Sequence, residues 1–187
     1  MRAGIKPDTV IAAAADIADR DGWSEVTLSN VAGLLGIKTP SLYNHIAGLD
    51  DLRGKLSVHA SRLLLGALVD AAVGRAGKEA FVEVGRAYVR FVREHPGLYE
   101  ATYRFGAARP AEYDETAQEI LSLLYRLLRP FGFSETDGVH AIRGLRSLLH
   151  GFASIESDGG FRMNVDRDES LNVIISRYID GFGSADA

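Results

Sequence analysis

The sequence predicts an all-α protein. Through most of the 187 residues, apolar side chains recur every three or four positions, as they do on one face of a helix, rather than alternating as in a half-buried strand. Glycine and proline separate these periodic segments. A hydrophobic content of 47% is enough for a substantial core in a chain of this length. We therefore expect helices arranged in one or two compact domains.

The first periodic segment covers residues 7–22. Its small and apolar residues fall on one side of a helix, which Gly22 ends because glycine accepts backbone conformations that other residues avoid. Trp23 follows as an aromatic anchor. The apolar side consists of Val10, Ala13, Ala14, Ile17 and Ala18.

Residues 27–46 predict two short helices joined by a glycine turn. Thr27 can accept a hydrogen bond from an unpaired N–H of the first turn, so the first helix begins near Leu28. Gly36 supplies the left-handed conformation that ends it. Thr39 can cap the second helix, and Pro40 fits its first turn, where a missing N–H costs nothing. The buried side is expected to consist of Leu28, Val31, Ala32, Leu35, Ile37, Leu42 and Ile46.

The second of these helices leaves polar side chains available to a partner. They are hydrogen-bond donors and acceptors of the kind that bind phosphates and base edges in DNA. A short polar helix fixed by a turn is typical of the recognition helix of a helix-turn-helix, although the same short pattern also occurs in proteins that do not bind DNA. The available residues are Lys38, Ser41, Tyr43, Asn44 and His45.

This segment resembles the TetR family of bacterial transcription regulators. The similarity in residue type and spacing lies at Thr27, the pair Val31 and Ala32, Gly36, the pair Leu42 and Tyr43, and His45. The resemblance covers about residues 4–64 and implies a three-helix, helix-turn-helix DNA-binding domain with its motif at 27–46. Residues 65–187 would then form a helical bundle for regulation, ligand binding and dimerisation.

Weaker similarity continues to the end of the chain. Residues 87–99 and 148–161 look like a regulatory domain found in one branch of that family and named for a Trp-His-Gly motif. Leu149 stands in the Trp position here.

The resemblance implies a homodimeric regulator, not an enzyme, that binds a pseudo-palindromic DNA operator. It would be a repressor released by a small-molecule effector. Family roles place Thr27, Tyr43 and His45 on phosphates, and the major groove or its edge would receive Lys38, Thr39, Pro40, Ser41 and Asn44. The alternative is a helical small-molecule-binding protein or enzyme that keeps the fold without binding an operator.

One position departs from the family pattern. Six residues after Tyr43 the family often places a lysine that contacts the DNA backbone, whereas this chain has Leu49 followed by Asp50 and Asp51. These carboxylates complement the positive end of the next helix and offer DNA nothing. We expect weaker phosphate binding than in a typical member, offset by Arg2 and Lys6 on an N-terminal arm.

Six further helical elements are expected after residue 49. Proline disfavours helical geometry in the residue before it, so the sequence His95-Pro96-Gly97 separates the second from the third. Ser134 with Asp137 resembles a capping box at the start of the fifth. The expected positions are about 50–73, from 81 to the stop at 95, 98–105, 117–131, 135–157 and 171–182.

The helix at 135–157 carries two stripes. Bulky residues form one, and small residues form the other, which lets a second helix approach closely. The small stripe could build a four-helix interface with a second protomer, as family resemblance favours, or could pack inside one protomer. The expected interface consists of Gly144, Ser147, Gly151, Ser154, Ile175 and Tyr178.

Aromatic residues from several segments could converge on an apolar cavity with a few hydroxyl groups, which is typical of a small-molecule site. The other interpretation is ordinary core packing. The candidates are Tyr88, Tyr99, Tyr103, Phe105, Tyr125 and Phe152.

Composition excludes several classes of function. The formal net charge of −4 argues against nonspecific coating of nucleic acid, since that depends on neutralising many phosphates. There is no cysteine for disulfide, thiolate or nucleophile chemistry. His140 and His150 lie ten residues apart, a rise of about 15 Å on a helix, which is too far to share a metal ion. We expect no cofactor, no metal, no membrane segment and a cytoplasmic location.

Overall fold

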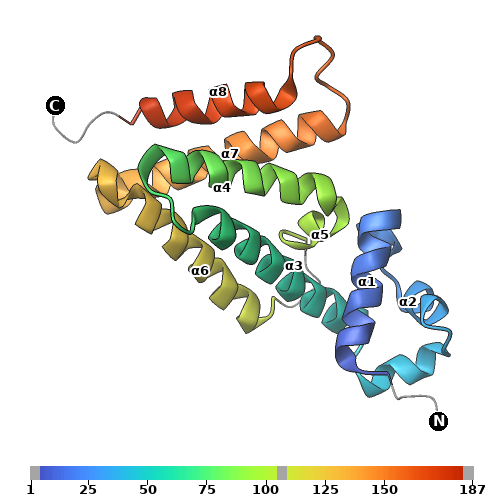
Figure 1. Ribbon diagram of the computed structural model, residues 1–187. Coiled ribbons are helices and arrows are strands. Elements are labelled where there is room, and N and C mark those ends of the chain that lie inside the picture. Colours follow the sequence, from blue (N-terminus) through green and yellow to red (C-terminus); the bar gives the residue numbers. More distant parts are fainter. Residues whose placement is uncertain (1–4, 105–108, 183–187) are drawn as a thin grey trace. The chain divides into compact units, whose positions relative to one another are not determined.

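The computed structural model describes residues 5–104 and 109–182, which fold into α-helices and short 3₁₀-helices with no strand among them (Figure 1). The predicted all-α class is confirmed. In chain order the elements are α1 (Pro7–Asp21), η1 (Trp23–Glu25), α2 (Leu28–Leu34), η2 (Thr39–Asn44), α3 (Leu49–Ala72), α4 (Gly77–Glu94), α5 (Pro96–Ala101), α6 (Ala111–Leu128), η3 (Arg129–Phe131), α7 (Glu135–Ser157) and α8 (Arg167–Asp180).

The chain forms two compact units. Unit 1 comprises Met1–Leu63 and Glu94–Ala117, and unit 2 comprises Leu64–Arg93 and Gln118–Ala187. The division predicted from the sequence lies between residues 64 and 65. In the structure, unit 1 also includes a segment from the middle of the chain, Glu94–Ala117. Helix α3 begins in unit 1 and ends in unit 2, and so does α6.

Unit 1 holds the inserted helix α5 against α1. A Cβ atom on Gly97 would lie 1.8 Å from the carbonyl oxygen of Ala18, so only glycine allows this approach of the two backbones. Asp19 of α1 accepts a hydrogen bond from the N–H of Leu98 at 2.8 Å, and its other oxygen lies 2.7 Å from Nδ1 of His95. Asp19 thereby satisfies one of the unpaired donors in the first turn of α5.

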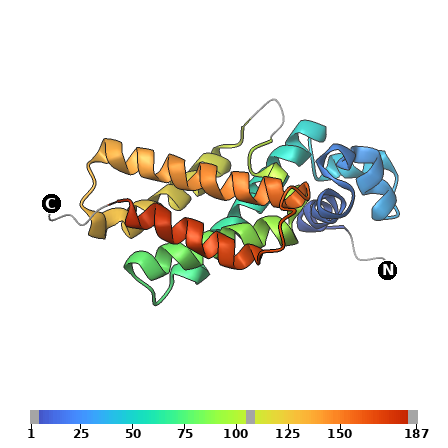
Figure 2. The ribbon, with the colours of Figure 1, turned by 90° about the horizontal axis from the view of Figure 1, so that it is seen from above.

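Unit 2 is a helical bundle in which α7 and α8 run side by side in opposite directions, next to α4 (Figures 1 and 2). Glycines let these helices approach one another. A Cβ on Gly85 of α4 would lie 2.5 Å from Cδ1 of Ile175, and one on Gly144 of α7 would lie 2.1 Å from the hydroxyl of Tyr178. That hydroxyl donates a hydrogen bond to the carbonyl of Ala141 at 2.8 Å.

Arg93 joins three helices of unit 2. Its Nε and Nη2 lie 2.7 Å and 2.9 Å from the carboxylate of Glu156 on α7, and its Nη1 lies 2.7 Å from Asp168 on α8. The hydrogen bonds that Arg93 donates to Glu156, with a further contribution from Asp168, raise the pKa of the Arg93 guanidinium despite partial burial. Unit 2 also contains an aromatic cluster, in which edge-to-face or stacked contacts join the rings of Phe81, Phe131, Phe133, Tyr178 and Phe182.

Several element boundaries differ from the sequence prediction. Helix α6 begins at Ala111, six residues before the predicted start at Ala117. Helix α8 begins at Arg167 because the Asp166 side chain accepts from the N–H of Glu169 at 2.7 Å, a cap that the prediction missed. Within the described ranges, no helix is both long and apolar enough to span a bilayer.

Candidate nucleic-acid interface

The turn between α2 and η2 follows the local rules of the sequence. Thr27 is the N-cap of α2, and its hydroxyl accepts from the N–H of Asn30 at 3.2 Å. Gly36 has a φ of 65°, the left-handed conformation that suits glycine. The N–H of Ile37 then reaches back to the carbonyl of Ala32 at 3.0 Å, which closes the end of α2.

The second helix differs in type from the prediction. It is a 3₁₀-helix, η2, of six residues, in which the N–H of Ser41 bonds the carbonyl of Lys38 and that of His45 bonds Leu42, both at 2.8 Å. Thr39 is its first residue rather than its cap, because Lys38 takes the cap position without a side-chain hydrogen bond. The predicted capping role of Thr39 is therefore wrong, whereas Pro40 does lie in the first turn.

Two buried anchors fix η2, and the rest of its surface is open. Leu42 and Ile46 are buried as predicted. Tyr43 points outward with 57% of its surface exposed, which is unusual for a large aromatic side chain without a packing role. Of the other predicted contact residues, Lys38, Pro40, Ser41 and Asn44 are exposed, and Thr27, Thr39 and His45 are half-buried.

The end of η2 is tied to the start of α3 by a charged pair. Lys55 donates to Oδ2 of Asp51 at 2.7 Å and to the carbonyl of His45 at 3.2 Å. Asp51 also accepts from the N–H of Ala47 at 2.8 Å. Partial burial raises the pKa of Asp51, but the hydrogen bonds from Lys55 and Ala47 outweigh it and leave this pKa below its usual value.

A second contact holds η1 against α3. The guanidinium of Arg53 lies 5.4 Å from the centre of the Trp23 ring, a cation–π contact, and its Nη2 donates to the carbonyl of Val26 at 3.3 Å. Since Val26 directly precedes the N-cap Thr27, Arg53 also positions the start of α2. Sequence reasoning identified Trp23 as an anchor and missed its partner.

Electrostatics at this surface are modest. Residues 27–46 contain no acidic side chain and one lysine, Lys38. The nearby Lys55 already donates hydrogen bonds to Asp51 and to the carbonyl of His45. Asp50 and Asp51 lie in the first turn of α3, as predicted, where their negative charges complement the positive N-terminal end of the helix. Binding to DNA at this surface would depend on hydrogen bonds and shape more than on charge.

The predicted ligand residues are divided between the two units. Tyr99 and Tyr103 belong to unit 1, where their ring centres lie 5.3 Å apart. Tyr88 and Phe152 are buried in unit 2, Tyr125 is half-buried there, and Phe105 lies outside the described residues. A pocket in unit 2 is lined by other residues, from the end of α3, the start of α4, α6 and η3. The six-residue site therefore remains a prediction.

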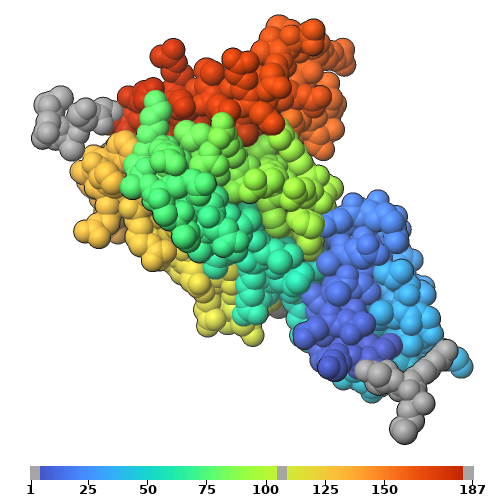
Figure 3. All heavy atoms as spheres, viewed as in Figure 1, coloured from blue at the N-terminus to red at the C-terminus, as the bar shows by residue number. Residues whose placement is uncertain are grey.

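The predicted dimer residues also fall into two groups. Gly144, Ile175 and Tyr178 pack inside unit 2, as described above, so the small stripe serves internal packing at Gly144. Ser147 and Ser154 are exposed, and a Cβ on Gly151 would meet nothing within 4 Å. On α8, Val173 and Ile174 are 51% and 39% exposed, along a helix that lies uncovered at the surface of unit 2 (Figure 3).

Comparison with known proteins identifies the family. The family described as "Tetracyclin repressor-like, C-terminal domain" matches residues 81–178. An uncharacterized HTH-type transcriptional regulator, YobS of Bacillus subtilis (strain 168), is 36% identical over 181 residues, which cover 96% of this chain and 94% of YobS. The chain belongs to the TetR family. It is therefore a DNA-binding transcriptional regulator.

Two further similarities agree with this assignment. The HTH-type transcriptional repressor DrrR1 of Streptomyces coeruleorubidus is 29% identical over 136 residues, covering 72% of this chain and 47% of DrrR1. The structure of SCO7222, a TetR from Streptomyces coelicolor, has a TM-score of 0.75 at 16% identity and covers 96% of this chain and 98% of its own. The latter likeness concerns the fold alone.

Besides Arg53, three positioning residues of this TetR-family protein escaped sequence reasoning. Lys55 follows Asp51 by four residues, so the helical spacing of opposite charges could have revealed that pair. Asp19 and His95 are separated by 76 residues, and nothing local in the sequence connects them.

Proposed function

We propose that the protein binds a pseudo-palindromic operator as a homodimer and represses transcription until a small molecule releases it. The observation that carries this proposal is η2, a short helix with two buried anchors and an outward row of polar side chains headed by Tyr43. Such a surface, presented by a glycine turn, fits the major groove of DNA.

Roles follow from position on η2 and its flanks. Tyr43, with its exposed ring and hydroxyl, contacts a phosphate, as do Thr27 and His45 at the margins of the surface. Lys38, Thr39, Pro40, Ser41 and Asn44 lie at or beside base edges. Phosphate contacts fix the register of the protein on DNA, and base contacts supply sequence preference.

Dimerisation is proposed because one copy of the surface is weakly charged. A single lysine on residues 27–46 neutralises few phosphates, so one unit alone binds with limited affinity. Two linked copies that engage half-sites about 34–36 Å apart gain affinity through effective concentration. The exposed strip formed by Ser147, Gly151, Ser154, Val173 and Ile174 is the proposed contact between protomers.

Ligand release is proposed from the connectivity of α3. This helix starts three residues after Ile46, the second anchor of η2, and ends in unit 2. A ligand that prefers one arrangement of unit 2 would shift the population of α3 orientations and change the separation of the two recognition helices. The shift cannot exceed the difference in ligand affinity between the two arrangements. Repression, rather than activation, is supported by the relative DrrR1, which is named a transcriptional repressor.

Gel shifts against the DNA upstream of the protein's own gene test operator binding. Tyr43→Ala should weaken binding at least tenfold on every bound sequence, because it removes a phosphate contact. Met163→Ala is the matched control, since Met163 is 87% exposed and lies far along the chain in the α7–α8 loop. Equal DNA affinities of the two variants would show that η2 does not contact DNA.

Selection of bound fragments from random DNA tests the base-reading roles. Lys38→Met and Ser41→Ala should change which bases are preferred, whereas Tyr43→Ala should lower affinity and leave the preference unchanged. If the wild-type protein enriches no sequence at all, the alternative of a helical small-molecule-binding protein or enzyme that does not bind an operator is favoured instead.

A further inference from the structure

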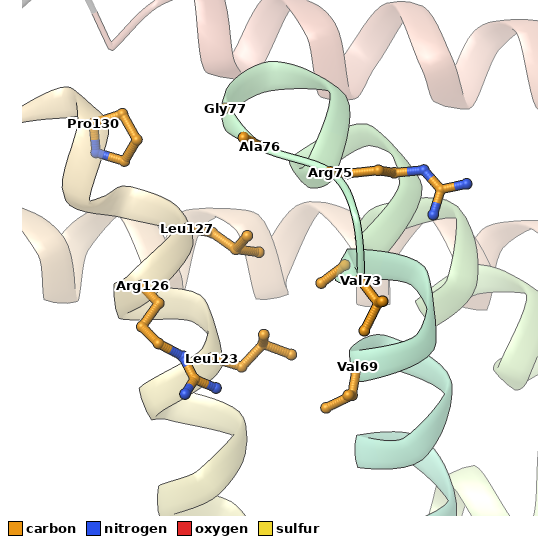
Figure 4. Close-up of a pocket in the computed structure, with 10 residues that line it drawn as sticks. Val69, Val73, Arg75, Ala76, Gly77, Leu123, Arg126, Leu127 and Pro130 are labelled. Atoms are coloured by element: carbon orange, nitrogen blue, oxygen red, sulfur yellow. The ribbon is translucent and has the colours of Figure 1, made fainter.

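Unit 2 contains a pocket at the end of α3. It has a volume of about 350 Å³, near the lower end of the range for small-molecule sites. Leu123 and Leu127 of α6 point toward Val69 of α3 and Val73, the residue that follows this helix (Figure 4). Ala72, Ala76, Gly77 and Pro130 complete the apolar lining. Gly74, in the turn after α3, and Gly77, the first residue of α4, have φ values of 75° and 53°.

The polar part of the lining is entirely basic. Arg75 and Arg126 line the pocket, and no acidic residue does. Arg75 points away from the space between the helices in Figure 4, donates to the carbonyl of Ala71 at 3.0 Å and lies 3.6 Å from Glu79. Its charge is therefore already partnered.

Arg126 is different. Its guanidinium lies beside Leu123 at the edge of the pocket (Figure 4). Among the residues that the structure describes, it has neither a hydrogen bond nor an ion pair. The residues one turn away on α6 are uncharged or basic, so no neighbour on its own helix neutralises it. A guanidinium with free donors is suited to a carboxylate, which it can bind through two parallel hydrogen bonds.

We infer that this pocket binds a compact amphipathic carboxylic acid, with its apolar body between α3 and α6 and its carboxylate on Arg126. Neutral molecules of the same shape gain only the apolar contacts, and cations meet the arginine unfavourably. The volume suits a medium-chain or single-ring acid rather than a polycyclic ligand.

The role of this acid as the effector rests on the proposed function. The pocket adjoins the last turn of α3, the helix whose first turn is bonded to the end of η2 through Asp51 and Lys55. Occupancy therefore acts on a single continuous helix shared with the DNA-binding surface. This route needs no contact between the acid and the residues of 27–46.

Binding is measured on the purified full chain by calorimetry and by thermal shift, with octanoate and 4-phenylbutyrate as the acids. Matched probes are 1-octanol and octylamine, which share the chain of octanoate without its carboxylate. The acids should raise Tm, because a ligand of the folded state stabilises it, and octanoate should bind at least tenfold more tightly than either matched probe. Equal affinity for octanoate and 1-octanol overturns the inference. So does the absence of binding of either acid at about 5 mM, a concentration at which even a weak, millimolar ligand would bind.

Two variants locate the carboxylate. Arg126→Met keeps an unbranched apolar side chain and removes the guanidinium, so it should weaken octanoate binding about tenfold while leaving 1-octanol binding unchanged. Arg129→Met removes a nearby exposed arginine that does not line the pocket, and it should bind octanoate like the wild type. Methyl NMR signals of Val69, Leu123 and Leu127 should shift on addition of octanoate. Equal effects of the two variants, or unshifted methyl signals, place the acid elsewhere and overturn the inference.

Gel shifts with octanoate separate this inference from the proposed function. If octanoate binds through Arg126 but does not release DNA, the pocket is correct and ligand release through it is wrong. If the wild-type protein shows no specific DNA binding, the operator proposal fails whatever octanoate does. Release of DNA by octanoate from wild type and Arg129→Met, but not from Arg126→Met, supports both.

Discussion

Gly97 shows how one residue decides the contact between two distant segments. Its missing side chain lets α5 rest on the last turns of α1, where the carbonyl of Ala18 occupies the space that a Cβ would need. The obstacle is backbone rather than a flexible side chain, so a neighbour cannot simply rotate away. A larger residue must push α5 away from α1 and stretch the hydrogen bond that the N–H of Leu98 donates to Asp19.

Gly97→Ala should therefore destabilise the protein by about 1–3 kcal/mol, the usual cost of overpacking. Gly66→Ala is the matched control, because Gly66 is exposed within α3 and a Cβ there would meet nothing within 4 Å. That control should stabilise by about 0.5–1 kcal/mol through helix propensity. Urea unfolding of both variants measures the difference, and equal stability would contradict the tight contact at Ala18.

Single residues whose role is local were predictable from the sequence. Thr27 caps α2 and Gly36 turns left-handed because each needs only its immediate neighbours. Asp19 was not predictable, since its partners His95 and Leu98 are 76 and 79 residues away. Without tertiary structure, Asp19 is one more acidic residue on a helix surface.

At the scale of elements, the junction between η2 and α3 decides how firmly η2 is held. A six-residue 3₁₀-helix has little stability of its own, because its hydrogen bonds are poorly aligned. Leu42 and Ile46 anchor it from below, and the pair Asp51 and Lys55 ties its end to α3. Asp51 lies two residues after Leu49, the position at which the family often has a backbone-binding lysine, and it helps to fix η2, the proposed recognition helix.

The lowered pKa of Asp51 predicts how this junction responds to acid. A carboxyl group whose pKa falls on folding stabilises the protein above its ordinary pKa of about 3.9, and this stabilisation is lost as pH falls through the lower, folded value. The free energy of unfolding of Asp51→Asn should lie below that of the wild type at pH 6, and the gap should shrink toward pH 3. Because both partners are partly exposed, the gap should stay below about 1 kcal/mol.

Asp50→Asn is the control for this pH series. Asp50 lies in the same first turn of α3, and its carboxylate makes no hydrogen bond within the described part of the chain. Its substitution should give a smaller gap at pH 6. A gap for Asp51→Asn that is constant from pH 3 to pH 6 would show that the pair with Lys55 does not form in solution.

Element type was less predictable than element position. Residues 39–44 were expected as a second helix and are helical, but their apolar spacing cannot distinguish a 3₁₀-helix from a short α-helix. Helix α6 starts earlier than expected because residues 111–116 are mostly polar and carry little periodic signal. Ser134, by contrast, marked the start of α7 correctly, since its hydroxyl accepts from the N–H of Asp137 at 3.1 Å.

For the whole molecule, the proposed dimer depends on a strip of small and apolar residues that the protomer leaves open. Gly151 is the centre of this strip on α7, and Val173 and Ile174 face outward on α8. Gly144 belongs to the same small stripe in the sequence but lies under Tyr178. One periodic pattern thus serves internal packing at one position and remains available to a partner at another.

Gly151→Arg should convert the dimer to a monomer and reduce operator affinity at least tenfold through loss of bivalent binding. Gly66→Arg introduces the same side chain on α3, outside the proposed strip and also with open space around it. This variant should stay dimeric. Sedimentation at micromolar concentration distinguishes the two states. A dimeric Gly151→Arg variant would place the interface elsewhere.

The scale of the whole molecule was the hardest to derive from sequence. The helix-turn-helix motif and the family were predictable because they depend on spacing within 20 residues, from Thr27 to Ile46. The inclusion of residues 94–117 in unit 1 was not, because it depends on contacts between α1 and α5, at Gly97 and through Asp19, that nothing local in the sequence indicates. The pocket beside Arg126 was also missed, since its lining combines ordinary leucines and valines from helices that are far apart in sequence.

Helix α3 also constrains how the gene can change. One residue inserted or deleted anywhere in its 24 residues would turn everything beyond that point by about 100° and displace it by about 1.5 Å. Substitutions at its exposed positions leave this phase intact, whereas changes of length alter it at once. Functional variants should therefore accumulate replacements along α3 while its residue count stays constant.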